Sequence, residues 1–321
     1  MIGNSQRAFS FELGRFWITF TSDCAGIERN PELTLNLGVF FRQVAGGTHV
    51  PYDPGNTSAT APGVTSLAWT EPAWRRYKNI IINNSNRFWN GRFWILPPAT
   101  SWSLCQFSNV APIERNRAEN SRFPTYAQAG TSGEPMQNLF SYNVFCKTNV
   151  YQAPSPAHAH ITFDVPYLPS GFRDDGNFIN FADAAGSGQG RLASGSVQAR
   201  SLSGAAVIPG HRAAHHHYQR QYIHEIGHAL GQRHVGFDVN DTLCAEAPSR
   251  VAGATHDHCY VGNSETDEMN IMGSGESIAN FNANPWKAVM ANLTGTTAGA
   301  WGVSRRRVWP RFIGRCQRRI L

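Results

Sequence analysis

The chain has 321 residues, of which 41% are hydrophobic, so it can bury a core, and this excludes a globally disordered protein. No apolar run approaches the roughly 18 residues of a membrane span, and Phe16–Phe20 is too short for the core of a Sec signal peptide. Basic residues exceed acidic ones by 28 to 22, but the excess lies in the C-terminal tail, whereas a nucleic-acid enzyme would spread basic charge along a face or groove.

The first part of the chain is predicted to be β-rich. Residues 16–20 and 33–41 are rich in aromatic and β-branched side chains and are bounded by Gly and Asn, which favours strands. Residues 46–66 are rich in Gly, Pro, Ser and Thr and predict a loop and a domain boundary.

A helix is predicted over residues 71–86, because apolar side chains recur at helical spacing and Pro72 lies in the first turn. Asn90-Gly91 predicts a turn before a strand at residues 92–96. Further strands are predicted at residues 143–151, 159–165, 177–181 and 205–208.

The remaining elements are two helices and two loops. A Gly/Ser-rich loop is predicted at residues 186–204 and a long helix at 212–232. Residues 235–280 are expected to be mostly loop, and 285–292 to form a short final helix. Strands, a helix, more strands and two later helices predict an α/β (α+β) fold with few helices.

The segment with the clearest chemical meaning has the pattern HExxHxxGxxH. On a helix, His224 and His228 project from one face, and Glu225 can reach a metal-bound water without binding the metal. Gly231 lets the chain turn, so that His234 becomes a third ligand. Three imidazoles leave the fourth position of a tetrahedral zinc ion open for water, whose proton Glu225 would accept. This pattern arises by chance in about 1 in 10⁴ such chains.

The pattern resembles that of the metzincin zinc endopeptidases. The resemblance implies a mixed twisted sheet, an active-site helix and a smaller C-terminal subdomain over residues 70–295. It also implies a Met-turn, which matches Asn270–Gly273 around Met272 better than it matches Met269. Some subfamilies have an oxyanion-stabilising Tyr where this chain has Ser274.

His258 and Tyr260, which precede the expected Met-turn in the sequence, are therefore candidates for an oxyanion-stabilising or cleft role.

The chain is expected to divide into three regions: a β-rich segment of unknown role at 1–65, a metzincin-like protease domain at 66–295 and an Arg-rich tail at 296–321. The tail is either a solvated terminus or a contact for an anionic partner or membrane surface.

The six cysteines form no CxxC pair. Cys244 and Cys259 close a short loop and could form a disulfide worth roughly 3 kcal/mol in an oxidising compartment. The other four are equally compatible with free buried thiols. Cys24 could act as a latency cysteine, although a structural role is favoured.

Other polar groups leave alternatives open. Residues 174–177 could hold a structural Ca²⁺ or form a simple turn, and residues 256–258 could bind a second ion or form a surface loop. His158 and His160 alternate in a strand-like run, and the strand at 159–165 is a candidate for the edge strand that pairs with substrate.

Three functions are weighed. The first is a zinc endopeptidase that cleaves protein or peptide substrates, monomeric, with no nucleic-acid partner, and secreted or delivered as a bacterial effector or toxin without a visible Sec signal. The second is a toxin-type metal-dependent nuclease that uses His215-His216 and the basic tail. The alternative without a function for these histidines is a polar start of the predicted helix. The third is an inactive metal-binding or adhesion module, against which the intact Glu225 argues.

Overall fold

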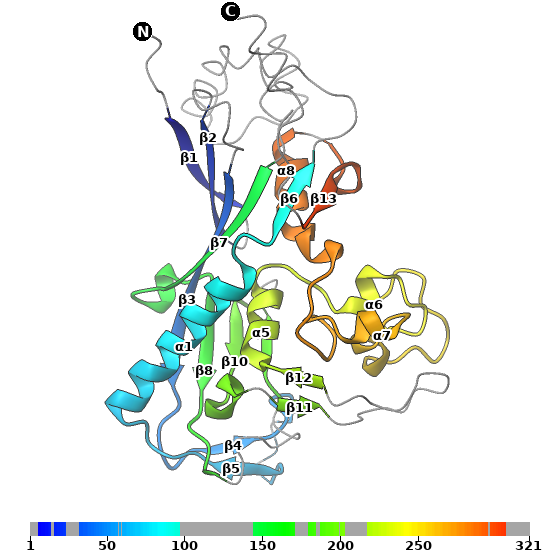
Figure 1. The fold of residues 1–321 in the computed structure, drawn as a ribbon. Helices are drawn as coiled ribbons and strands as arrows, with labels where there is room; N and C mark the ends of the chain where they lie inside the picture. Colours follow the sequence, from blue (N-terminus) through cyan, green and yellow to red (C-terminus); the bar gives the residue numbers. More distant parts are fainter. Residues whose placement is uncertain are drawn as a thin grey trace, which may run out of the picture. The chain divides into compact units, whose positions relative to one another are not determined.

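The computed structural model describes residues 6–13, 16–23, 32–56, 58, 60–96, 144–170, 179–183, 187–198, 200–202, 217–294 and 296–305. Their elements are shown in Figure 1. The strands are β1 (Gln6–Leu13), β2 (Phe16–Asp23), β3 (Glu32–Gln43), β4 (His49–Pro51), β5 (Gly63–Thr65), β6 (Phe93–Leu96), β7 (Val144–Gln152), β8 (Ile161–Val165), β9 (Phe181–Asp183), β10 (Gln189–Arg191), β11 (Arg200–Leu202), β12 (His217–Gln219) and β13 (Gly302–Ser304). The α-helices are α1 (Glu71–Trp89), α5 (Gln221–Ala229), α6 (Val235–Asp238), α7 (Glu265–Glu268) and α8 (Asn284–Thr294).

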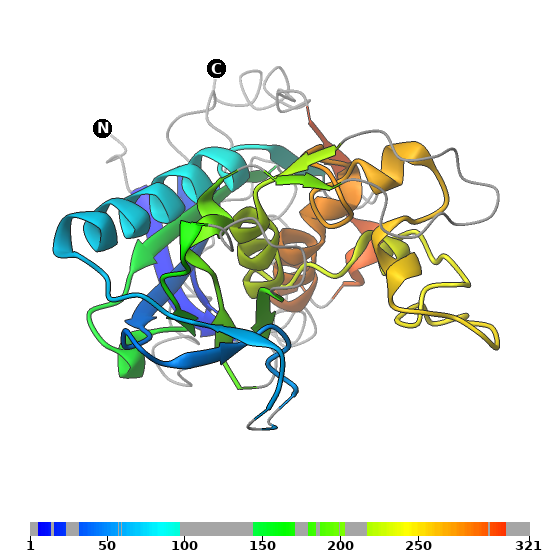
Figure 2. The ribbon, with the colours of Figure 1, turned by 90° about the horizontal axis from the view of Figure 1, so that it is seen from below.

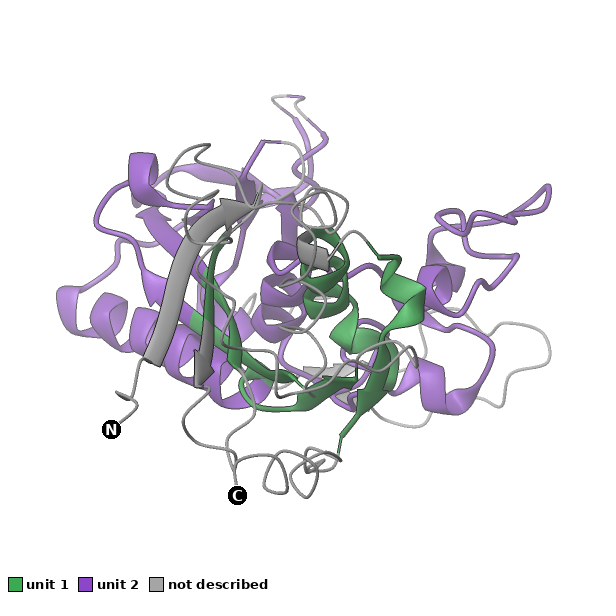
Figure 3. Ribbon diagram, turned by 90° about the horizontal axis from the view of Figure 1, so that it is seen from above, with its two compact units in different colours: residues 1–36, 89–149, 280–321 green, residues 37–88, 150–279 purple. Residues whose placement is uncertain are grey.

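Segments that alternate along the chain build two compact units (Figure 3). Unit 1 consists of Met1–Asn36, Trp89–Asn149 and Asn280–Leu321, and unit 2 of Leu37–Phe88 and Val150–Ala279. Strands β3 and β7 each contribute residues to both units. The three-part division expected from the sequence stays a prediction.

Unit 1 is built on antiparallel strands. Strand β2 pairs with β1 and with the first residues of β3, and β6 pairs with β7 and β13. Helix α8 supplies the buried Trp286, whose indole N–H donates to the Lys147 carbonyl at 2.9 Å and whose ring lies 5.7 Å from that of Phe93. The unit therefore has its own aromatic core.

Unit 2 contains the parallel part of the sheet. Strand β3 pairs in parallel with β8, β8 in parallel with β10, and β10 antiparallel with β9, which lies at the edge. Helix α1 packs on these strands through Trp74 and Tyr77, whose rings lie 6.5 and 6.3 Å from that of Phe41 on β3. Helices α1 and α5 lie on the same face of the strands (Figures 1 and 2).

The expected fold class is confirmed in its general form, as a mixed α/β fold with a large mixed sheet and few helices. The helix predicted at 71–86 and the strand at 92–96 are present, and Gly91 adopts the positive φ of 68° that the predicted turn requires. None of the helices among the described residues is both long and apolar enough to span a bilayer.

The long helix predicted at 212–232 is wrong at its N-terminal end. Its described residues His217–Gln219 form strand β12, which pairs with β11, and α5 begins at Gln221. Hydrogen bonding to a distant strand decides the structure here, and the polar sequence before Gln221 has no apolar periodicity to favour a helix.

Two predicted loops also contain strands. Residues 46–66 include β4 and β5, and 186–204 include β10 and β11. These strands have only three residues each, too few for a periodic pattern to reveal them.

The interpretation of the strand at 159–165 is corrected. Strand β8 lies between β3 and β10, so the sheet ends on this side with β9 and not with β8. His158 lies in a short 3-10 helix, and the Nδ1 atom of His160 accepts the Gly38 N–H at 2.8 Å. These two histidines therefore do not form one face of a strand, and His160 helps to hold the backbone of β3.

Candidate metal centre

Helix α5 separates a core face from a polar face. Its apolar side chains are fully buried: Tyr222, Ile223, Ile226 and Ala229. The helix ends at Ala229, and Gly231 follows with a φ of 91°, a conformation that favours glycine over any side chain with a Cβ. This turn redirects the chain toward His234, as the sequence predicted.

The three histidines of the pattern converge. His224 and His228 lie one turn apart on α5, and their Nε2 atoms are 3.0 Å apart. The ring of His234 lies 4.6 Å from that of His228 and 5.5 Å from that of His224. One nitrogen from each ring falls within 4.8 Å of the others, so these residues could hold a metal ion.

Each Nδ1 atom has its own partner. That of His224 lies 2.7 Å from the Ile271 carbonyl oxygen, and that of His228 lies 3.0 Å from the Gln232 carbonyl oxygen. Because a carbonyl oxygen only accepts, both Nδ1 atoms must carry the proton. The third, on His234, lies 2.6 Å from a carboxylate oxygen of Glu246.

These partners leave the Nε2 lone pairs without a donor. Those of His224 and His228 face each other, which is repulsive between neutral rings unless a cation lies between them. The Nε2 atom of His234 is buried without a hydrogen-bond partner, a costly arrangement that a bound cation would relieve. Two nitrogens at about 2.0–2.1 Å from a tetrahedral zinc ion lie about 3.3 Å apart, close to the spacing seen here. The donor set therefore fits a divalent metal.

Burial favours the neutral form of two of these imidazoles. Together with the neighbouring histidines, it lowers the pKa of His224 well below its ordinary value and that of His228 to about 3. Neutral imidazole is the form that binds a metal.

Glu225 lies next to the first histidine and is 6% exposed. Burial raises the pKa of its carboxyl group to about 8. A carboxyl group with a pKa near neutrality can both accept and donate a proton, which is the property that a general base and acid needs.

The segment around Met272 is hydrogen-bonded to α5 and to the residue that follows the third histidine. The Met272 carbonyl accepts the Val235 N–H at 3.0 Å, and its own N–H donates to the side chain of Asn270 at 2.9 Å. Met272 is fully buried, whereas Met269 is 43% exposed. Met272 thus lies between two chain segments that carry histidines, and Met269 does not share this position.

Gln219, which was not predicted, clamps this segment. Its buried side-chain amide donates to the carbonyls of Ile271, Gly273 and Gly275 at 2.8–3.2 Å. The next residue, Arg220, forms a two-point ion pair with Glu276 at 2.7 and 2.8 Å. No spacing in the sequence signals these contacts, because they join residues more than 50 positions apart.

Of the two cleft candidates, the structure brings Tyr260 to the histidines. Its ring lies 4.2 Å from that of His234 and 5.8 Å from that of His224. Burial raises the pKa of Tyr260, and the charges of Glu225 and Glu246 raise it further, so its hydroxyl remains a donor. Among the described ring contacts, the loop histidine next to His234 is His256, at 5.0 Å, rather than His258.

The predicted disulfide is present between Cys244 and Cys259. Cys146 is a free buried thiol. Several other residues singled out in the sequence lie outside the described residues: Cys24, Cys105, Cys316, the calcium candidate at 174–177, His215, His216 and most of the Arg-rich tail.

No protein-family model matches this chain, and no curated protein or solved structure matches it. The chemistry of the centre therefore has to be argued from its own residues.

Proposed function

We propose that the chain is a zinc-dependent endopeptidase of the metzincin type. The observation that carries this proposal is the convergence of three imidazoles, one nitrogen of each within 4.8 Å of the others, with Nδ1 of each ring held by its own partner, beside a buried glutamate. Three neutral nitrogen ligands are typical of catalytic rather than structural zinc.

Bound zinc supplies a Lewis acid that polarises a carbonyl group and lowers the pKa of water to about 7. Glu225 accepts the proton of the attacking water and then donates it to the leaving amine. The raised pKa of Glu225 supports this double role, and a divalent cation nearby would lower that pKa toward the working pH.

Two further features support a peptide substrate. Strand β9 is an edge strand next to α5, so an extended peptide could add to it by main-chain hydrogen bonds. The hydroxyl of Tyr260 keeps its proton and could donate to the oxyanion that forms at the attacked carbonyl.

The disulfide supports a secreted protein, because disulfides persist in oxidising compartments.

The test compares wild-type protein with Glu225→Ala on a denatured protein substrate, with bound zinc quantified in each. The variant should retain about one zinc ion and lose about 10²- to 10⁴-fold in cleavage rate. Glu71→Ala is the control, because Glu71 is exposed at the start of α1 and pairs only with Arg75 at 3.3 Å in the described contacts.

Three results would contradict the proposal. They are a wild-type protein that binds no zinc, a wild-type protein that binds zinc but cleaves no peptide bond, and a Glu225→Ala variant that cleaves as fast as the wild type. Metal-dependent cleavage of nucleic acid in place of protein would favour the nuclease hypothesis.

A further inference from the structure

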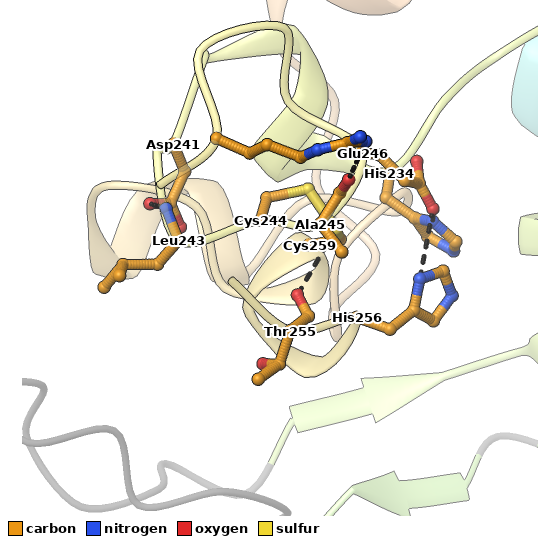
Figure 4. The surroundings of a disulfide bond; sticks show 10 residues. His234, Asp241, Leu243, Cys244, Ala245, Glu246, Thr255, His256 and Cys259 are labelled. Carbon is orange, nitrogen blue, oxygen red and sulfur yellow. Dashed lines mark hydrogen bonds and ion pairs between the residues drawn. A yellow bond between two sulfur atoms is a disulfide. The ribbon is translucent and has the colours of Figure 1, made fainter. Parts of the chain in front are cut away.

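The Glu246 carboxylate lies between two histidines that differ in burial and in their distance from it. Its Oε1 atom is 2.6 Å from Nδ1 of His234 and 3.4 Å from Nδ1 of His256 (Figure 4). His234 is nearly buried, whereas the side chain of His256 is 59% exposed. The shorter contact therefore joins Glu246 to the histidine that could bind the metal.

A disulfide-closed loop carries this carboxylate. Glu246 follows Cys244 by two residues, and His256 precedes Cys259 by three (Figure 4). Inside the loop, the Ala245 N–H donates to the Thr255 carbonyl at 3.0 Å, which joins the two arms next to both polar residues. The disulfide and this hydrogen bond thus hold the loop from Cys244 to Cys259 in place, and we call this loop the platform.

The same platform contacts the chain next to His234. A Cβ on Gly236, two residues after His234, would lie 3.0 Å from Cβ of Cys244 and 2.9 Å from Cα of Cys259. Only a residue without a side chain permits this approach. The disulfide therefore packs directly on the segment that carries the third histidine.

The hydrogen-bond pattern favours a positioning role over a second metal site. His234, Glu246 and His256 lie close enough to hold an ion. However, the Glu246 carboxylate already accepts from Nδ1 of His234 at 2.6 Å, and its contact with His256 is longer, at 3.4 Å. Among the buried atoms of this group, Nε2 of His234 lacks a hydrogen-bond partner, and it lies on the opposite side of the ring from Nδ1.

We propose that Glu246 is a positioning residue for the third metal ligand: it holds the proton on Nδ1 of His234 and directs the Nε2 lone pair to the metal. Carboxylate partners of ligand histidines fix the tautomer and orientation of the ring and raise its basicity. The inference rests on the metal centre of the proposed function, but not on the reaction that this centre performs.

The experiment measures the zinc affinity of the full chain by competition with a chromophoric chelator. Glu246→Ala should weaken zinc binding by about 10- to 100-fold. Glu246→Gln should recover much of this loss, because its amide oxygen still accepts from Nδ1. Asp257→Asn is the control, since it removes one negative charge from an exposed position of the same loop.

Two further readouts separate positioning from stability. The metal-free variants are compared by thermal unfolding, and the Co²⁺-loaded proteins by visible absorption. A tetrahedral Co²⁺ spectrum that changes in Glu246→Ala and returns in Glu246→Gln supports a change at the ligand itself, which a general loss of stability would not produce.

Several results would overturn the inference. A zinc affinity in Glu246→Ala equal to that of the wild type would remove the positioning role and leave the proposed function intact. Two ions per wild-type chain, falling to one in Glu246→Ala, would make Glu246 a ligand of a second site. Wild-type protein that binds no zinc would contradict the proposed function itself, and the positioning role with it.

Discussion

Helix α5 and the loop from Gly231 to Glu276 supply the same candidate metal centre, but they hold their histidines by different means. On the helix, His224 and His228 are spaced by one turn and donate to backbone carbonyls. In the loop, His234 depends on the side chain of Glu246 and on a platform closed by a disulfide. The comparison shows one ligand pair spaced by the helix and oriented by backbone carbonyls, and one ligand oriented by a carboxylate side chain on a disulfide-closed loop.

Removing a ligand from either region should have the largest effect. We expect His228→Ala and His234→Ala each to weaken zinc binding by more than the roughly 10- to 100-fold expected for a positioning residue. Chelator competition measures the loss, and His158→Ala, in an exposed 3-10 helix, is the control. If His234→Ala bound zinc as tightly as the wild type, the loop would not supply a ligand.

Opening the disulfide should lower the stability of the protein and loosen the loop that carries Glu246. The double substitution Cys244→Ser with Cys259→Ser should lower the free energy of unfolding by about 3 kcal/mol, because the bridge closes a loop of 15 residues. It should also weaken zinc binding, since Glu246 loses its brace. Urea unfolding and chelator competition measure the two effects, and Cys146→Ala should leave zinc affinity unchanged. An unaltered zinc affinity in the double variant would show that zinc binding does not depend on the disulfide-closed platform.

Gln219, two residues before α5, is hydrogen-bonded to the loop, so its loss should lower stability. Gln219→Met keeps the approximate size of the side chain but removes the amide donor from the buried carbonyls of Gly273 and Gly275. We expect the free energy of unfolding to fall by about 1–3 kcal/mol. Thermal unfolding of the metal-free protein checks this, with Gln198→Met at an exposed position as the control. Equal stability of the two variants would be inconsistent with the clamp.

The smallest effect is expected in the core under α1. The buried Tyr77 hydroxyl lies 3.2 and 3.3 Å from the carbonyls of Ala193 and Leu192. Tyr77→Phe should cost about 1 kcal/mol of stability and leave zinc affinity unchanged. A change in zinc affinity would show that the centre depends on this core as well as on α5 and the loop.

The sequence was most informative where structure depends on near neighbours. Helix α1 follows from apolar spacing, the turn at Gly91 from Asn-Gly, and the pairing of His224 with His228 from their separation by one turn. The short loop between Cys244 and Cys259 also made that disulfide a reasonable expectation.

The sequence was least informative where distant segments meet. Strand β12 was expected to be helical because nothing local signals its pairing with β11. Glu246 was not singled out, although an acid inside a cystine loop downstream of His234 is a signal that could have drawn attention to it. The edge position of β9 depends on the order of the whole sheet, which no single segment encodes.

The most direct test of the metal centre is X-ray absorption at the zinc edge of the zinc-loaded, full-length protein. We predict one zinc ion per chain with three imidazole nitrogens at about 2.0–2.1 Å and one further oxygen ligand. In His234→Ala, the number of imidazole ligands should fall to two or the ion should be lost. A wild-type spectrum with two imidazoles or fewer, or with sulfur ligands, would contradict the convergence of His224, His228 and His234 on one metal ion.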